Sequence, residues 1–291
     1  MKRMDTVCLI QARSGSLRLP GKVFRTLPLE PESMEQKPHG AEETGPNQAS
    51  TGTESAGSAN LSEWQRRSGQ ELSILEHCIR RLEKARVGPV YALIPHDDQP
   101  MQAYLEQRSI SFIAGPLDDV RARFALAAQV TGARYIVRAT ADNPCVDPGF
   151  ARKSVERIHE LGADLFAFSG LPLGCAVEVF SAESLDCRQG PEEMDPSEYR
   201  EHVSLHIKHH PDLYNVVIEP SGLPEKPRLR LTVDEEADFL LVQSIFQKLG
   251  SDFQVADVLE LQKRSPELFE INAGIQQRKF PAHLFTNRHS A

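Results

Sequence analysis

Residues 8–22 concentrate residue types that bind phosphate oxygens. The segment contains three cations, two hydroxyls and two glycines, namely Arg13, Arg18, Lys22, Ser14, Ser16, Gly15 and Gly21. Glycine lets the backbone approach a ligand closely, so that backbone N–H groups can cradle an anion. Guanidinium groups add bidentate hydrogen bonds, and an ammonium group adds a compact charge. All of these charges are positive although the chain is acidic overall, which favours a polyphosphate site over an ordinary surface loop.

An apolar run, Val7 to Ile10, directly precedes the cationic part of this segment. Such a run is typical of a strand that is buried on both faces of a parallel sheet. The segment matches neither the Walker pattern Gly-x-x-x-x-Gly-Lys-Ser/Thr nor the dinucleotide pattern Gly-x-Gly-x-x-Gly. The sequence therefore predicts a strand that leads into a phosphate-binding loop of a different type.

Two aspartates follow predicted strands in the same way. Asp142 comes shortly after the apolar run Tyr135 to Val137, and Asp234 comes directly after Leu229 to Val233. Ligands of open α/β sheets gather at the carboxyl ends of the strands, so we expect Asp142 to face the same crevice as the N-terminal loop. Carboxylates at such positions commonly hold Mg²⁺, which shares its oxygen ligands with phosphates.

Other acidic residues near both aspartates offer alternative interpretations. Asp147, just before Pro148, suits a helix N-cap. The residues that compete with Asp234 are Glu235, Glu236 and Asp238, which also suit the solvated first turn of a helix. On the residues alone, Asp142 is therefore the firmer prediction of a metal ligand.

The length, composition and net charge of the chain argue against several classes of protein. The chain has 291 residues, of which 40% are hydrophobic, and this is enough for one large α/β domain or two smaller ones. Its net charge of −8 argues against nucleic acid as a partner, because a surface that binds nucleic acid is normally basic. No membrane span or signal-peptide core is apparent, so we expect a cytoplasmic protein without membrane contact. The 5 cysteines are widely spaced without a Cys-x-x-Cys pair, and predict neither a disulfide framework nor a zinc ribbon.

Residues 31–70 interrupt the chain with a polar segment rich in proline and glycine, which predicts a flexible insertion. Regular alternation resumes at Glu71. The predicted strands span 90–94, 110–113, 135–137, 165–168, 214–218 and 229–233, and residues 173–180 predict a glycine turn followed by a further strand. The predicted helices span 72–82, 99–108, 118–130, 150–161, 197–208, 239–249 and 255–263. Alternation of this kind implies a mostly parallel sheet with right-handed crossovers.

The N-terminal segment resembles the Ala-Arg-x-Gly-Ser-x-Arg-x-Pro-x-Lys signature of cytidylyltransferases that activate acidic sugars. Residues 10–22 fit a longer form of the signature, Ile-Gln-Ala-Arg-x-Gly-Ser-x-Arg-Leu-Pro-Gly-Lys. In this form the segment resembles one branch of these enzymes, the spore coat polysaccharide biosynthesis protein F type. The resemblance implies a three-layer α/β/α fold of the nucleotide-diphospho-sugar transferase type, Rossmann-like, with a small additional β element. It implies a single domain over 1–291, interrupted by 31–70.

The resemblance also implies an activity and a set of site residues. The activity is transfer of CMP from CTP to an acidic, nonulosonic-acid-like sugar with Mg²⁺ and release of pyrophosphate, by an enzyme that is a homodimer and supplies surface polysaccharide or glycoprotein glycan synthesis. The implied nucleotide ligands are Ala12, Arg13, Gly15, Ser16, Arg18, Lys22, Asp119, Val120 and Arg123. The implied catalytic residues are Arg13, Lys22 and Asp142, and the metal ligands are Asp142 and Asp234. The implied sugar-binding residues are Gly174, Glu178 and His202.

Some of these residues have alternative interpretations. Asp119 could cap a helix, and Arg123 could form a surface ion pair. Three histidines, His202, His206 and His209, would share one helical face, but no Glu follows His202 as in the zinc motif His-Glu-x-x-His. Ala176 stands where the resembled family commonly has an acidic residue, so the sugar is not specified.

Two other functions compete with cytidylyl transfer. One is a pyrophosphorylase that joins another nucleoside triphosphate to a sugar phosphate, and the other is a nucleotide-binding regulatory protein without turnover. Both carboxylates, Asp142 and Asp234, accompany Arg13 and Lys22. A protein that only binds a nucleotide does not need both carboxylates, so their presence favours catalysis.

Overall fold

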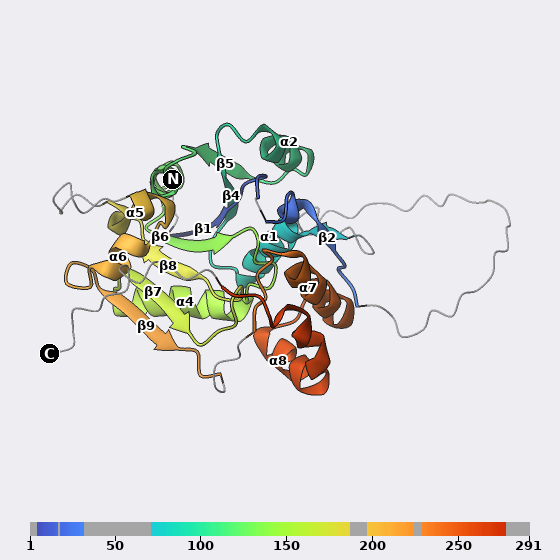
Figure 1. Ribbon diagram of the computed structural model, residues 1–291. Coiled ribbons are helices and arrows are strands. Elements are labelled where there is room, and N and C mark those ends of the chain that lie inside the picture. The colour runs from blue at the N-terminus through green and yellow to red at the C-terminus, as the bar shows by residue number, and fades with distance from the viewer. Residues whose placement is uncertain (1–4, 17, 32–70, 187–196, 224–228, 278–291) are drawn as a thin grey trace, which may run out of the picture.

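The computed structural model describes residues 5–16, 18–31, 71–186, 197–223 and 229–277. They form a seven-stranded sheet in the order β5-β4-β1-β6-β8-β7-β9 (Figure 1). The strands are β1 (Thr6–Gln11), β4 (Val90–Pro95), β5 (Phe112–Gly115), β6 (Tyr135–Thr140), β7 (Leu165–Ser169), β8 (Glu178–Ser181) and β9 (Val216–Pro220). Neighbouring strands pair in parallel except at β8, which is antiparallel to both β6 and β7. The prediction of a mostly parallel sheet is confirmed.

Alternating side chains of β1 separate two hydrophobic layers. Cys8 and Ile10 pack in a core cluster with α1 (Ile74–Ala85) and α4 (Pro148–Leu161). Val7 and Leu9 enter a second cluster on the other face, with α3 (Val120–Thr131). All of these β1 side chains are fully buried, as expected for a central strand between two helical layers. The predicted three-layer α/β/α arrangement is therefore confirmed.

A third hydrophobic cluster lies beside the main sheet and is built on α7 (Glu236–Leu249) and α8 (Val255–Arg264). A two-stranded antiparallel sheet of β2 (Thr26–Leu27) and β3 (Leu72–Ser73) adjoins it, because Leu27 is part of that cluster. This small sheet is the additional β element that was predicted. Residues 32–70, nearly all of the predicted insertion, lie outside the described residues.

Side-chain caps fix the starts of the helices around the sheet. Asp98 caps α2 (Gln99–Gln107), Asp119 caps α3 and Asp147 caps α4, each accepting a hydrogen bond from a backbone N–H of the first turn. Ser73 caps α1 and forms a capping box with Glu76. The N-cap interpretation of Asp147 is thus confirmed.

Two element predictions are wrong. The helix expected over 197–208 is two short helices, α5 (Ser197–Glu201) and α6 (Leu205–His209). In the turn between them, the Val203 side chain is fully buried and the Ser204 hydroxyl donates to Glu178. One continuous helix would not allow both contacts. Since the turn interrupts the helical spacing, the three histidines do not share one helical face.

The strand expected over 229–233 is a buried connection with only an isolated bridge, between Leu173 and Arg230. The N–H of Leu231 bonds to Leu173, and the N–H of Val233 bonds to the carbonyl of Asp142. The apolar side chains that suggested a strand instead fill the cluster around α7 and α8.

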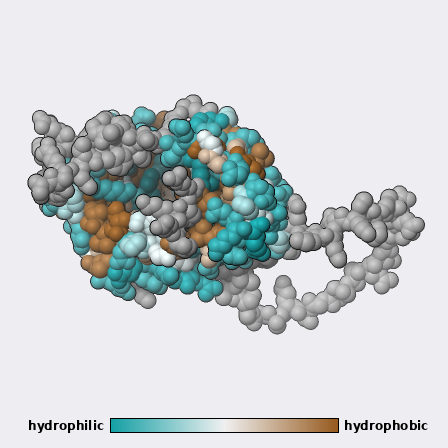
Figure 2. All heavy atoms as spheres, turned by 60° about the horizontal axis from the view of Figure 1, so that its bottom comes forward, coloured by the Kyte–Doolittle hydropathy of each residue, from teal (hydrophilic) through white to brown (hydrophobic). Residues whose placement is uncertain are grey.

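None of the described helices is long and apolar enough to cross a lipid bilayer. Figure 2 shows hydrophobic side chains on the surface gathered in separate patches among hydrophilic ones.

Candidate active site

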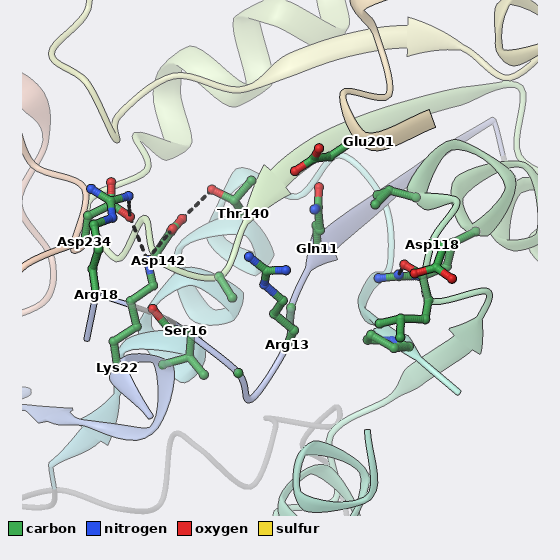
Figure 3. Close-up of a pocket in the computed structure, with 18 of the residues that line it drawn as sticks. Gln11, Arg13, Ser16, Arg18, Lys22, Asp118, Thr140, Asp142, Glu201 and Asp234 are labelled. Atoms are coloured by element: carbon green, nitrogen blue, oxygen red, sulfur yellow. Dashed lines mark hydrogen bonds and ion pairs between the residues drawn. The ribbon is translucent and has the colours of Figure 1, made fainter. Parts of the chain in front are cut away.

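A cavity of about 680 Å³ opens at the carboxyl ends of β1 and β6, whose last residues, Gln11 and Thr140, line it (Figure 3). The residues predicted from the sequence that line it are Ala12, Arg13, Gly15, Ser16, Arg18, Lys22, Val120, Arg123, Asp142 and Asp234. The topology therefore brings together the N-terminal loop and both predicted metal ligands, although they lie far apart in the sequence.

Lys22 is the point where the two aspartates meet. Its Nζ atom lies 2.8 Å from Asp142 Oδ2 and 2.8 Å from Asp234 Oδ1. Lys22 is the first residue of the 3₁₀ helix η1 (Lys22–Phe24) and is preceded by Gly21, whose φ of 66° lies in the left-handed region that favours glycine. This turn directs the ammonium group into the cavity between the two carboxylates (Figure 3).

Asp234 is held by three cations. Its Oδ1 atom also lies 3.0 Å from Arg18 Nη2, and its Oδ2 atom lies 2.7 Å from Arg230 Nη2. Burial alone would raise the pKa of Asp234, but the hydrogen bond and charge of Lys22, together with the two arginines, lower it. The side chain therefore remains a carboxylate at neutral pH.

A further layer of hydrogen bonds holds the segment that carries Asp234. Asp238, fully buried, pairs with Arg230 and accepts hydrogen bonds from the backbone N–H groups of Asp234 and Glu235. The amide nitrogen of Asn272 donates to Asp238 Oδ1 and to the carbonyl of Arg230, each at 2.9 Å. Asp234 is therefore fixed both by its side chain and by its backbone.

Asp142 is oriented from its own strand end. The hydroxyl of Thr140 donates to Asp142 Oδ1 at 2.6 Å, and Asn143 donates to that hydroxyl at 2.9 Å. This arrangement leaves Asp142 Oδ2 for Lys22. Neither Thr140 nor Gln11 was predicted as a site residue, although both end strands whose carboxyl ends were expected at the crevice.

The glycine loop contributes a guanidinium group and backbone. Arg13 is exposed and points into the cavity, towards Gln11 and Glu201 (Figure 3). Nothing within 4 Å would meet a Cβ atom at Gly15, so the space beside its backbone is open to a ligand. Exposed backbone and cations at one wall are the features that phosphate binding requires.

At the other end of the cavity, α3 contributes Val120 and Arg123, with Leu117 and Asp118 before it. Arg123 donates to the carbonyls of Pro116 and Leu117, and burial, followed by repulsion from Arg13, lowers its pKa. Asp119 does not line the cavity and accepts the capping hydrogen bond from Ala122 at 2.7 Å. The capping alternative is therefore what the structure shows for Asp119.

Three residues predicted to bind the sugar, Gly174, Glu178 and His202, are not among those that line the cavity. Gly174 has a φ of 97°, and a Cβ atom there would lie 2.5 Å from the backbone nitrogen of Thr232. Glycine at this position therefore lets two chain segments approach each other. Contact of these three residues with substrate stays a prediction.

Glu178 carries hydrogen bonds and ion pairs on both carboxylate oxygens. Lys208 binds Oε1, while Arg138 and Ser204 bind Oε2 at 3.1 and 2.6 Å. Burial alone would raise its pKa, but Lys208 and Arg138 outweigh this effect and lower the pKa to about 2. Glu178 thereby ties the α5–α6 segment to the sheet.

From that segment, Ser197 and Glu201 line the cavity. The sequence predicted His202, the last residue of the run Tyr-Arg-Glu-His at 199–202, as a sugar contact. The neighbouring Glu201 is the residue of the run that faces the cavity (Figure 3). Within the part of the chain that the structure describes, the other histidines of the segment do not belong to a group of three or more His, Cys, Asp or Glu side chains that could hold a metal ion.

A sequence model of the cytidylyltransferase family matches residues 71–267. The chain belongs to the cytidylyltransferase family. This cytidylyltransferase is 28% identical over 270 residues to the spore coat polysaccharide biosynthesis protein SpsF of Bacillus subtilis (strain 168), covering 90% of this chain and 96% of that protein. The family resemblance stated from the motifs is confirmed.

Solved structures share the fold of this cytidylyltransferase. A cytidylyltransferase from Leptospira borgpetersenii serovar Hardjo-bovis (strain JB197) superposes with a TM-score of 0.67 at 20% identity, covering 94% of this chain and 100% of that one. The synthetase of CMP:2-keto-3-deoxy-manno-octonic acid, complexed with CTP, gives a TM-score of 0.51 at 13% identity, covering 83% and 98%. The predicted fold type is therefore confirmed.

The donor set fits a hard divalent cation. Two carboxylate oxygens, from Asp142 and Asp234, converge on one cationic atom, Lys22 Nζ. Mg²⁺ prefers oxygen ligands and usually takes only one or two carboxylates, completing its shell with water and substrate phosphates. Two converging carboxylates beside a phosphate-binding loop meet that description.

Proposed function

We propose that this cytidylyltransferase transfers CMP from CTP to an acidic sugar and releases pyrophosphate. The observation that carries the proposal is the convergence of Asp142 and Asp234 on Lys22 in the cavity that the glycine loop lines. Family membership supports the nucleotide, and the name of the Bacillus relative supports a product used in polysaccharide synthesis. The proposal extends these findings to a particular class of acceptor.

In this proposal the N-terminal loop binds the triphosphate. Arg13 and Arg18 pair with phosphate oxygens, while the backbone of Ala12, Gly15 and Ser16 completes the cradle. Val120 and Arg123 lie at the far end of the cavity, where the cytidine fits, and Asp119 holds their helix in place through its cap. Positioning and electrostatics carry most of the catalysis in a reaction of this kind.

Asp142 and Asp234 would hold the Mg²⁺ ion. When bound, the ion neutralises charge on the triphosphate and on the departing pyrophosphate. Lys22 competes with a cation for the same two carboxylate oxygens, so its ammonium group is available to phosphate once the carboxylates have another partner. Lys22 then stabilises the charge that develops in the transition state.

The acceptor approaches from the side of Gln11 and Glu201. Its hydroxyl oxygen forms a bond to the α-phosphorus and releases its proton to solvent water, while the bond from that phosphorus to the bridging oxygen breaks and its electron pair leaves with pyrophosphate. Glu201 accepts hydrogen bonds from the sugar, and Glu178 positions Glu201 through the α5–α6 segment.

We further propose that the enzyme is a homodimer and works in the cytoplasm. Light scattering of the purified protein gives the mass of the assembly and so tests the homodimer.

The test is turnover with each of CTP, UTP, ATP and GTP against a panel of nonulosonic and related sugar acids, with Mg²⁺. Release of pyrophosphate and the mass of the product are measured together. Turnover confined to CTP with an acidic sugar supports the proposal. Turnover with a different nucleotide and a sugar phosphate would replace it by the pyrophosphorylase alternative, and CTP binding without any turnover would favour the regulatory one.

A further inference from the structure

Ser14 is the exception in the phosphate-binding loop. Its neighbours on both sides, Arg13 and Gly15, line the cavity, but Ser14 does not. Both of its polar groups point to Asp98 instead: its backbone N–H donates to Asp98 Oδ2 at 2.7 Å, and its hydroxyl donates to Oδ1 at 2.6 Å. The backbone N–H and the hydroxyl of Ser14 are therefore bound to Asp98 and not available to phosphate.

Asp98 is also the N-cap of α2. Its Oδ1 atom accepts a hydrogen bond from the backbone N–H of Met101 at 3.1 Å. This one carboxylate thus joins the loop after β1 to the start of the helix after β4, the strand that pairs directly with β1. Three donors on a half-buried carboxylate make a rigid junction, because hydrogen bonds to a charged acceptor are stronger than neutral ones.

A carboxylate at this position opposes the function of the loop electrostatically. A negative charge next to a polyphosphate site repels the ligand, so a benefit from Asp98 has to come from geometry. The geometry is specific: when Ser14 is turned away from the cavity, the residues on either side of it face inwards. A loop held in its bound conformation before the ligand arrives loses less conformational entropy on binding.

We propose that Asp98 is a positioning residue for the triphosphate, which clamps Ser14 so that Arg13 and the Gly15–Ser16 backbone face the ligand. The inference rests on the proposed function only in naming CTP as that ligand. If only its charge mattered, removing the carboxylate of Asp98 would tighten the binding of CTP. If the clamp matters, removing that carboxylate weakens the binding of CTP, so the two effects predict opposite outcomes.

The decisive variant is Asp98→Asn. Asparagine caps helices about as well as aspartate, so α2 is expected to persist. When the amide oxygen keeps the capping hydrogen bond from the backbone N–H of Met101, the NH₂ group replaces the oxygen that faces the backbone N–H of Ser14. The variant therefore keeps the cap and breaks the clamp. The matched control is Asp97→Asn, which removes the same charge one residue away, where the side chain is exposed.

Calorimetry with CTP and Mg²⁺ is the first measurement. We expect Asp98→Asn to weaken binding at least tenfold, Ser14→Ala to weaken it less, and Asp97→Asn to leave it unchanged or make it slightly tighter. In turnover, the KM for CTP should rise in Asp98→Asn while kcat at saturating CTP changes by less than threefold. Binding by Asp98→Asn as tight as by Asp97→Asn would overturn the proposal.

Hydrogen exchange of the Ser14 and Gly15 amides, followed by NMR without ligand, is the second measurement. We expect at least tenfold faster exchange in Asp98→Asn and unchanged exchange in Asp97→Asn, since only the former breaks the clamp. Unchanged exchange in both variants would refute the clamp itself. Wild-type protein that binds no CTP would instead refute the proposed function, and the exchange rates would still decide whether Asp98 orders the loop.

Discussion

The two sides of the cavity differ in how their charged side chains are held. On the phosphate side, Lys22, Arg18, Asp142 and Asp234 form a continuous set of ion pairs with short distances. On the side where we propose that the acceptor binds, Glu201 is exposed and faces the cavity. One side is thus organised in advance by ion pairs, whereas the other presents an exposed carboxylate to the cavity.

This difference matches the two tasks of a group-transfer site. The side where charge develops gains from fixed, desolvated groups, because groups that need not reorganise stabilise a transition state most. The side that selects an acceptor needs accessible groups that exchange water for substrate. The following changes test this division, from the largest expected effect to the smallest.

Lys22→Ala and Asp142→Asn each remove a member of the organised side. We expect turnover to fall at least a hundredfold in both variants, while thermal unfolding remains cooperative, since each change still leaves Asp234 paired with Arg18 and Arg230. Pyrophosphate release measures the rate. Lys263→Ala, which alters an exposed surface pair with Glu260, is the control and should be normal. A rate near that of the wild type in either active-site variant would refute its assigned role.

Glu201→Gln tests the accessible side. We expect the KM for the sugar acid to rise about tenfold, with the KM for CTP unchanged, because the neutral amide oxygen of Gln accepts a hydrogen bond that is weaker than that of the carboxylate by roughly 1–1.5 kcal/mol. Initial rates with each substrate varied in turn provide the measurement. Glu198→Gln, on the same short helix but outside the cavity lining, serves as the control. An equal rise in both KM values would place Glu201 among the nucleotide contacts.

Asn272→Ala tests whether the organised side depends on the layer behind it. The change leaves the buried Asp238 and the carbonyl of Arg230 each without one donor. We expect a loss of about 1–3 kcal/mol in the free energy of unfolding and a decrease of several-fold in kcat through a less well-placed Asp234. Denaturant unfolding and single-turnover rates check the two effects. Reduced stability with an unchanged kcat would show that the layer supports the fold and not the site.

Glu178→Gln is expected to have the smallest effect on turnover, and its main effect lies in the pH dependence of stability. The pKa of Glu178 is lowered from 4.5 to about 2, so its carboxylate stabilises the fold above pH 4.5 and loses that contribution as the pH falls from 4.5 to 2. The variant should be less stable than the wild type at pH 7, and the difference should narrow over that acid range. Chemical unfolding at several pH values measures it. A difference that is constant from pH 7 to pH 2 would contradict the ion pairing.

The phosphate side was predictable because its residues follow strands. The order of residue types from β1 into the loop, and from β6 to Asp142, reflects a local rule about strand ends and ligands. The acceptor side was less predictable: the turn at 202–204 exists because Val203 and Ser204 contact the sheet, and no local pattern shows this. The buried connection at 229–233 was mistaken for a strand for a similar reason, since apolar runs look alike whether they pair or only pack.

By itself, the sequence determined the alternation of strands and helices, the helix caps Asp119 and Asp147 and the chemistry of the N-terminal loop, and with the family resemblance it predicted Asp142 and Asp234 as metal ligands. Only the tertiary structure decided which carboxylates meet at Lys22, that Asp98 turns Ser14 away from the cavity, and that Glu201 and not His202 lines the wall. The physical reason is distance along the chain. Caps and strand patterns depend on neighbours within a few residues, whereas these contacts join segments that only the order of strands in the sheet brings together.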